Sequence, residues 1–151
     1  MSDRATMLPP QPQPDFDTEG FWKATASGRV ELCRCVECGL WHHPPLERCR
    51  ACAGKTTFAP IAGTGRLRSF IVVQHGAVPG YLDAIPYVVG LVELDEQSGL
   101  RLAGRVLDVR PGELACGARV RSEVISLPPG EFSVVGFRIE GVPDNREEEV
   151  A

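Results

Sequence analysis

Four cysteines carry the clearest chemical signal in this sequence of 151 residues. They form two C-x-x-C pairs, Cys35 with Cys38 and Cys49 with Cys52, with ten residues between the pairs. A C-x-x-C turn reverses the chain and presents both sulfurs to one centre, so two such turns facing each other form a tetrahedral four-sulfur site. The spacing therefore predicts one structural zinc ion per chain. A closed shell of four thiolates leaves no position for a catalytic water.

Other ligands and other metals were weighed against this prediction. Iron stays an alternative, because rubredoxin-type sites use the same four sulfurs. Cys33 forms C-x-C with Cys35, but only Cys35 has the two-residue spacing to Cys38, so we expect Cys33 not to bind the metal. His42 and His43 precede two prolines and are expected on the surface of a hairpin. A disulfide framework is disfavoured, since no sequence signal directs the chain to an oxidising compartment.

Outside these cysteines the sequence contains no catalytic motif: no G-x-S-x-G, no phosphate-binding P-loop and no H-E-x-x-H. Cys116 has no histidine near it in sequence, and we expect it to be a small buried side chain. His75 is expected at the solvent-facing end of a strand. We therefore predict no catalytic residue in this chain.

Composition and turn signals divide the chain into five segments. We expect a Pro- and Gln-rich disordered tail (1–14), an N-terminal helix (15–28), a zinc ribbon (29–58), an OB-fold barrel (59–143) and an acidic tail (144–151). The predicted fold class is mainly β, with a short helix leading into a rubredoxin-like ribbon and then a five-stranded barrel.

The predicted helix carries two large aromatic side chains, Phe21 and Trp22. Asp17 or Thr18 is suited to cap its beginning, and Gly28 is suited to end it. The two aromatic residues are expected either to pack the helix onto the ribbon or to contact a partner.

The barrel is predicted from five runs with the features of β-strands, separated by Gly- and Pro-containing turns. Five antiparallel strands without helical stretches favour a small OB-fold. The helix that usually joins its third and fourth strands is expected to shrink to the connection 110–119. The runs are 66–75, 85–94, 100–109, 118–126 and 132–140.

Charge argues against a nucleic-acid surface. The net charge is −4, and residues 63–143 hold eight basic against nine acidic side chains. Nucleic-acid binding usually requires a basic excess.

The sequence has no signal peptide and no apolar run of membrane-spanning length, so we expect a cytoplasmic protein that contacts no membrane. Three aromatic residues, Phe70, Tyr81 and Tyr87, are expected to border the face on which an OB-fold usually stacks flat ligands, with the core or an interface as the alternative.

The order of these features resembles the zinc-ribbon/OB-fold acyl-CoA-associated family, long catalogued as a domain of unknown function. The resemblance covers about residues 15–141, and one departure is Leu46, where the family commonly has an arginine. The matching residues are Phe21-Trp22, Cys35, Cys38-Gly39, Pro44-Pro45, Cys49, Cys52 and the strand from Pro86-Tyr87 through Glu93-Leu94.

This resemblance implies an accessory subunit of a thiolase or of a thiolase-like aldolase or acyltransferase. The partner would supply the chemistry on a CoA thioester, and this chain would help bind acyl-CoA and stabilise a hetero-oligomer with two copies of each subunit. Two alternatives stay open: a nucleic-acid-binding ribbon–OB protein, and an iron-binding electron carrier. Residues assigned to acyl-CoA are Phe70, Tyr81, Tyr87, Arg66 and Arg68, and residues assigned to the partner are Phe21, Trp22 and Trp41.

Overall fold

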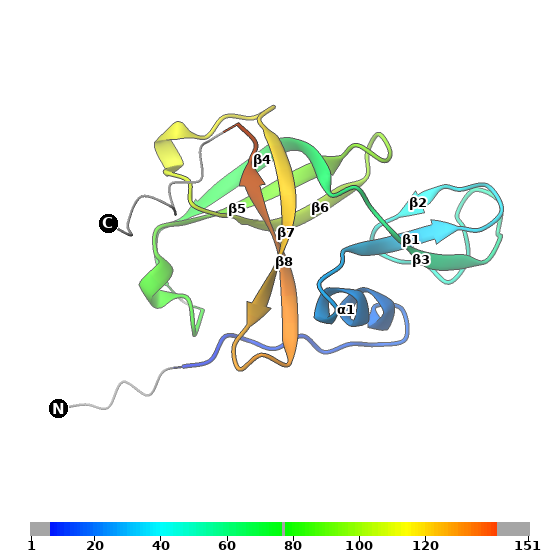
Figure 1. Ribbon diagram of the computed structural model, residues 1–151, viewed down its shortest axis with the longest axis horizontal. Helices are drawn as coiled ribbons and strands as arrows, with labels where there is room; N and C mark the ends of the chain where they lie inside the picture. Colours follow the sequence, from blue (N-terminus) through cyan, green and yellow to red (C-terminus); the bar gives the residue numbers. More distant parts are fainter. Residues whose placement is uncertain (1–6, 77, 142–151) are drawn as a thin grey trace, which may run out of the picture.

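The computed structural model describes residues 7–76 and 78–141 and confirms the predicted fold class (Figure 1). A short helix and a three-stranded ribbon sheet precede a closed five-stranded barrel. No helix in the described part of the chain is long and apolar enough to cross a membrane. The elements are α1 (Glu19–Ala26), β1 (Glu31–Cys35), β2 (Trp41–His42), β3 (Thr56–Pro60), β4 (Thr64–Val73), η1 (Leu82–Ala84), β5 (Tyr87–Leu94), β6 (Arg101–Val106), η2 (Pro111–Glu113), β7 (Arg119–Leu127) and β8 (Phe132–Ile139).

The barrel has the strand order β4-β5-β6-β8-β7, and β7 closes onto β4. Its five strands match the five predicted runs. Four of the pairings are antiparallel, as expected, whereas the short pairing of β6 with β8 is parallel. The predicted connection between the third and fourth strands contains only the one-turn helix η2. This is the OB-fold topology.

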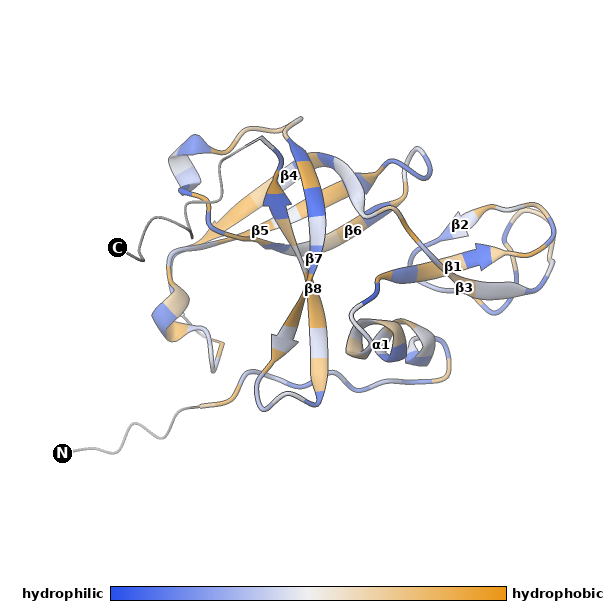
Figure 2. Cartoon of the chain, viewed as in Figure 1, coloured by the Kyte–Doolittle hydropathy of each residue, from blue (hydrophilic) through white to orange (hydrophobic). Residues whose placement is uncertain are grey.

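Alternating side chains fill the barrel. Along β5 every second residue is buried, and apolar positions recur along the barrel strands in Figure 2. Phe137 and Leu67 are fully buried at the centre. Gly90 and Gly104 lie opposite each other on β5 and β6, and a Cβ on Gly104 would lie 2.9 Å from the ring of Phe137. Glycine at these positions therefore makes room for the large side chains.

Hydrogen bonds fix the chain just before helix α1, and a glycine ends the helix. Thr18 occupies the N-cap position, as predicted, but its side chain makes no hydrogen bond to the helix. Instead the backbone N–H and the hydroxyl of Thr18 both donate to Asp15 Oδ1, at 2.9 and 2.7 Å. These hydrogen bonds lower the pKa of Asp15. Gly28, with a φ of 78°, follows the helix as expected and lets the chain turn toward β1.

Residues 7–14 contain no helix or strand and run along the barrel (Figure 1). Pro9 is buried, and the side-chain amide of Gln11 donates to the carbonyl of Pro128 at 2.8 Å. The predicted acidic tail, 144–151, lies outside the described residues.

The ribbon and the barrel share one hydrophobic core. Leu32 and Trp41 of the ribbon belong to the same buried cluster as Leu102 of the barrel. Gln97, between β5 and β6, holds the two parts together through the backbone of Trp41. The backbone N–H of Trp41 donates to Gln97 Oε1 at 2.9 Å, and Gln97 Nε2 donates to the Trp41 carbonyl at 3.2 Å. The side chain of Gln97 thus binds the backbone N–H and C=O of Trp41 as a neighbouring strand would.

A second polar contact closes the barrel where β7 meets β4 and β5. Arg119 donates two hydrogen bonds to Asp95, each 2.8 Å long, and the hydroxyl of Thr64 donates to the same carboxylate at 2.7 Å. The hydrogen bonds from Arg119 and then Thr64 lower the pKa of Asp95 to about 2.

We predict that Gln97→Ala lowers the free energy of unfolding by about 1–3 kcal/mol, because it leaves two backbone groups of Trp41 without partners. Chemical denaturation of the metal-loaded protein measures this loss. Gln74→Ala, at an exposed glutamine after β4, is the matched control and should leave stability unchanged. Equal stabilities of the two variants would contradict a clamping role for Gln97.

We predict that the stabilising effect of Asp95 depends on pH. Its folded pKa lies below the unfolded value of 3.8, so the contribution is complete above the unfolded pKa and disappears as pH falls toward 2. The parent should therefore be more stable than Asp95→Asn at neutral pH, and the difference should shrink in acid. Because acid also releases a metal from cysteines, the quantity to measure is the difference between the two proteins at each pH. A difference that does not change with pH would refute the prediction.

Candidate metal centre

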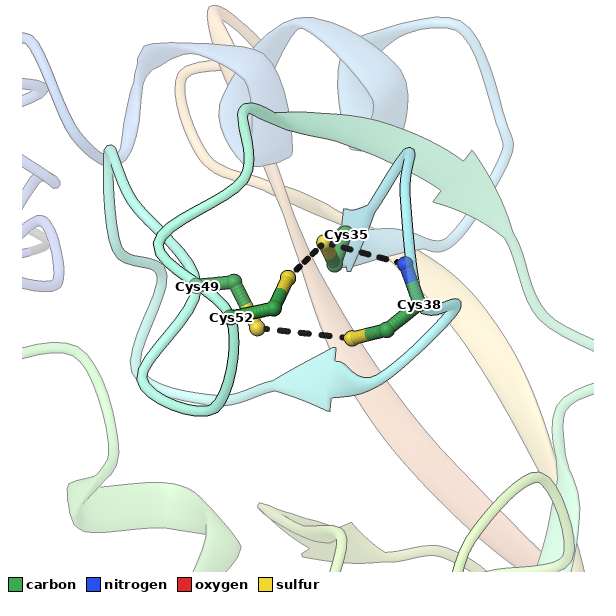
Figure 3. Close-up of side chains that lie close together, drawn as sticks. All are labelled: Cys35, Cys38, Cys49 and Cys52. Carbon is green, nitrogen blue, oxygen red and sulfur yellow. Dashed lines mark hydrogen bonds between the residues drawn. The ribbon is translucent and has the colours of Figure 1, made fainter.

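The four predicted cysteines come together at the end of the ribbon. Their sulfur atoms all lie within 4.8 Å of one another (Figure 3). Cys35 Sγ is 3.5 Å from Cys52 Sγ, and Cys38 Sγ is 3.6 Å from Cys49 Sγ. These separations are too long for disulfides, in which the sulfurs are about 2.05 Å apart. They are close to the roughly 3.8 Å between the sulfurs of a tetrahedral site with Zn–S bonds of about 2.3 Å.

Two similar turns position the sulfurs. In the first, the N–H of Gly39 donates to the carbonyl of Cys35 at 3.1 Å, and in the second the N–H of Ala53 donates to the carbonyl of Cys49 at 2.9 Å. Gly39 and Ala53 both have left-handed backbone conformations, with φ of 76° and 59°. This conformation turns the chain away after each pair, and in the second turn a non-glycine residue adopts it.

The backbone also prepares the sulfurs to hold a cation. The N–H of Cys38 points at Cys35 Sγ at 3.5 Å and lowers the pKa of the Cys35 thiol to about 6. For Cys52 the N–H of Gly54 lowers the pKa, but hydrogen bonds with the sulfurs of Cys35 and Cys38 raise it, to about 12 on balance. Without a cation the cluster therefore keeps a proton at Cys52, and a bound metal would displace that proton. The four residues fit a metal ion.

Cys33 lies outside the cluster. It is 3% exposed on β1, and its thiol donates to the carbonyl of Leu46 at 3.4 Å. Its partner across the sheet is His42, which is only 1% exposed, so the expectation that His42 lies on the hairpin surface was wrong. Burial, followed by the nearby charge of Arg50, lowers the pKa of His42 and keeps its ring neutral. His43 is exposed, as expected.

The structure brings together only part of the set assigned to acyl-CoA. The rings of Tyr81 and Tyr87 lie 5.7 Å apart. Phe70, on β4, packs against the core. In the register of β4 with β5, Arg66 lies opposite Glu93 near the start of β4. Tyr87 lies opposite Val73, at the other end of that ten-residue strand. Arg66 and its neighbour Arg68 are therefore remote from the two tyrosines.

Arg105, which the sequence analysis missed, joins the two tyrosines. Its guanidinium carbon lies 5.2 Å from the centre of the Tyr87 ring and 5.7 Å from that of Tyr81. The sequence offers little signal for this role, because the third apolar run contains two arginines, Arg101 and Arg105, and the contact with the tyrosines depends on strand pairing.

The structure also corrects the expected exposure of Trp41 and of Cys116. Trp41, assigned to the partner, is 7% exposed in the shared core, with Arg34 over its ring, and has little surface to offer. Cys116 was expected to be buried but is exposed, because it lies in the turn between η2 and β7. Phe21 and Trp22 are half-buried, with ring centres 5.0 Å apart, and line a cavity of about 260 Å³ between α1, the ribbon and β6.

A four-cysteine ribbon followed by an OB-fold barrel defines a known class of proteins. Residues 22–59 match the family model described as the ChsH2 rubredoxin-like zinc ribbon domain, and residues 59–124 match the ChsH2 C-terminal OB-fold domain. The "DUF35 domain-containing scaffold protein" of Methanothermobacter thermautotrophicus is 32% identical over 107 residues, which are 69% of this chain and 78% of that protein. The chain belongs to the ChsH2/DUF35 family.

Two other similarities concern proteins with descriptive names. The "Probable enoyl-CoA hydratase alpha subunit" of Thermomonospora curvata is 32% identical over 132 residues, and this chain spans only 40% of its length. A chain of a solved structure described as "Ltp2-ChsH2(DUF35) aldolase" is 31% identical, with a TM-score of 0.78, over 85% of this chain and 98% of that one.

We predict that serine at any one of the four clustered cysteines lowers the metal content below one ion per chain and destabilises the ribbon, because a four-ligand site has no spare ligand. Elemental analysis of the purified protein measures the content. A colourless protein would indicate zinc, whereas absorption in the visible range would indicate iron.

Cys33→Ser is the control within the same strand. This variant should keep the full metal content, because the Cys33 thiol lies outside the cluster and donates a hydrogen bond to a backbone carbonyl. Full metal in Cys35→Ser, together with loss in Cys33→Ser, would overturn the ligand assignment.

Proposed function

We propose that this chain is a non-catalytic, zinc-binding accessory subunit that associates with a thiolase-superfamily enzyme acting on acyl-CoA. One observation carries the proposal: the similarity to the chain described as "Ltp2-ChsH2(DUF35) aldolase" covers 98% of that chain. The similar part is thus nearly all of that chain and not a fragment of it. The word "scaffold" in the name of the Methanothermobacter relative agrees with an accessory role.

The chemistry of the chain supports a role without catalysis. A four-sulfur zinc site is closed and has no open position for water or substrate. The two remaining thiols are poor nucleophile candidates, since the Cys33 thiol donates to a carbonyl and Cys116 stands on an exposed turn. An activated nucleophile needs a base within hydrogen-bond reach. Neither thiol is hydrogen-bonded to a histidine within residues 7–76 and 78–141.

The partner would dock on apolar surface near the start of α1 and the ribbon hairpin. Phe16 is 82% exposed and Leu46 is 41% exposed, and together they line a small hollow with Pro45 and Phe58. The cavity beside Trp22 shares Pro45 and Phe58 with this hollow. Exposed aromatic and aliphatic groups of this kind mark interaction sites on soluble proteins. We assign the partner contact to this surface, to which α1 and the ribbon both contribute.

Acyl-CoA binding would be shared between the subunits. The arginines and the tyrosines that the sequence analysis assigned to acyl-CoA lie toward opposite ends of β4. The barrel by itself therefore does not gather these groups into one site. We propose that the partner completes the acyl-CoA site and that this chain contributes part of its wall.

We predict that the chain, purified from its native host with a tag, brings down a thiolase-superfamily enzyme. Phe16→Asp should weaken this association at least about ten-fold, because a charge replaces an apolar contact at the interface. Its matched control is Ile71→Asp, at an apolar side chain on β4 that is 63% exposed. Metal content and circular dichroism check that both variants fold.

The activity of the recovered enzyme on acyl-CoA should fall when this subunit is removed. Cys116→Ala should leave that activity within a few-fold of the parent, since no catalytic thiol is proposed. Recovery of nucleic acid, or of the chain alone, would contradict the accessory role. A loss of about a thousand-fold in Cys116→Ala would identify a missed nucleophile.

A further inference from the structure

A cavity of about 380 Å³ opens on the side of the barrel between Arg105 of β6 and the strands β7 and β8. Strands β6 and β8 pair over a short stretch there, Arg105 with Gly136 and Val106 with Phe137. Apolar side chains make most of the wall, among them Ile125, Leu127, Val134 and Val135. The volume falls in the range of about 300–1,000 Å³ that is typical of small-molecule sites.

Arg105 supplies a positive charge at this cavity. Its guanidinium rests against the rings of Tyr81 and Tyr87, and such cation–π contacts hold an arginine in one orientation. Arg105 Nε is buried and has no hydrogen-bond partner among the residues that the structure describes. No carboxylate in the described ranges forms an ion pair with Arg105, whereas Arg101, four residues earlier on the same strand, pairs with Glu93. A buried donor on a charged group is costly when it stays unpaired, so the site is complementary to an anion from outside.

The N-terminal segment forms one edge of the cavity. Pro9 lines it and is buried. The side-chain amide of Gln11 donates to the carbonyls of Pro9 and Pro128, at 2.9 and 2.8 Å. A Cβ on Gly80 would lie only 2.5 Å from the backbone nitrogen of Pro9, so the segment is in close contact with the β4–β5 connection. The cavity is therefore enclosed by three separate parts of the chain.

We infer that this cavity binds a small organic carboxylate with an apolar body. A planar guanidinium matches a carboxylate through two parallel hydrogen bonds, and the apolar wall suits an aliphatic or aromatic body. A phosphate ester carries more charge and would require more donors. Besides Arg105 the cavity lining offers only two side-chain hydroxyls, those of Tyr81 and Ser126. The inference concerns binding by this chain alone and does not depend on the partner enzyme.

Isothermal titration calorimetry of the metal-loaded chain with octanoate, octanamide and AMP tests the inference. Octanoate should bind at least about ten-fold more tightly than octanamide, because only the carboxylate forms a charge-assisted pair. Equal binding of the acid and the amide would overturn the inference, as would no binding of octanoate. Tighter binding of AMP than of octanoate would overturn the inference and show that the site prefers a phosphate to a carboxylate.

Arg105→Met should weaken octanoate binding at least about ten-fold, since it keeps a side chain of similar length but removes the charge. Arg101→Met is the matched control on the same face of β6 and should bind octanoate like the parent. Thermal unfolding and metal content check both folds. Unchanged binding in a folded Arg105→Met would refute the assignment, and the comparison of octanoate with octanamide on the parent decides the matter if that variant does not fold.

Discussion

The gathering of four cysteine sulfurs at one point is the constraint on which the ribbon depends. β2 is only two residues long, and the turns that carry the cysteines are short. The four sulfur atoms lie within 4.8 Å of one another, so they cannot all ionise unless a cation compensates their charge. Cys35 ends β1 and Cys52 precedes β3, so a bound cation would fix both of these strand ends. Helix α1 packs against β8 as well as β1, so the barrel also supports the helix.

The ribbon does not stand apart from the barrel. Leu32 and Trp41 complete a core that continues into the barrel at Leu100 and Leu102. The clamp of Gln97 on the backbone of Trp41 adds a directional contact to this apolar one. Apolar contacts have little directional preference, whereas two hydrogen bonds to the backbone N–H and C=O of one residue fix how the ribbon and the barrel are aligned. The ribbon therefore has a fixed position relative to the barrel, and so does the surface that the ribbon would present to a partner.

Local patterns in the sequence were sufficient for the strands and the metal cluster. The alternation in β5 follows from one face packing inward, and a C-x-x-C turn is a local structure. Features that depend on distant segments were missed. His42 and Trp41 are buried because β2 pairs with β1 and meets Gln97, 56 residues beyond Trp41. Arg105 meets its two tyrosines only after β5 and β6 pair, so no spacing along the chain marks it.

One extended segment connects the two surfaces to which we assign ligands. Pro9 lines the carboxylate cavity, and Phe16, seven residues later, stands exposed at the proposed partner surface. Figure 1 shows this stretch running along the barrel into α1 without a helix or strand between them. Hydrogen bonds of Gln11 hold its first part, and those of Asp15 and Thr18 hold its last. Gln11 is fixed to the barrel between these two residues, so Pro9 and Phe16 are each held in place by the fold. The proposed carboxylate cavity and the proposed partner surface therefore share one structural element.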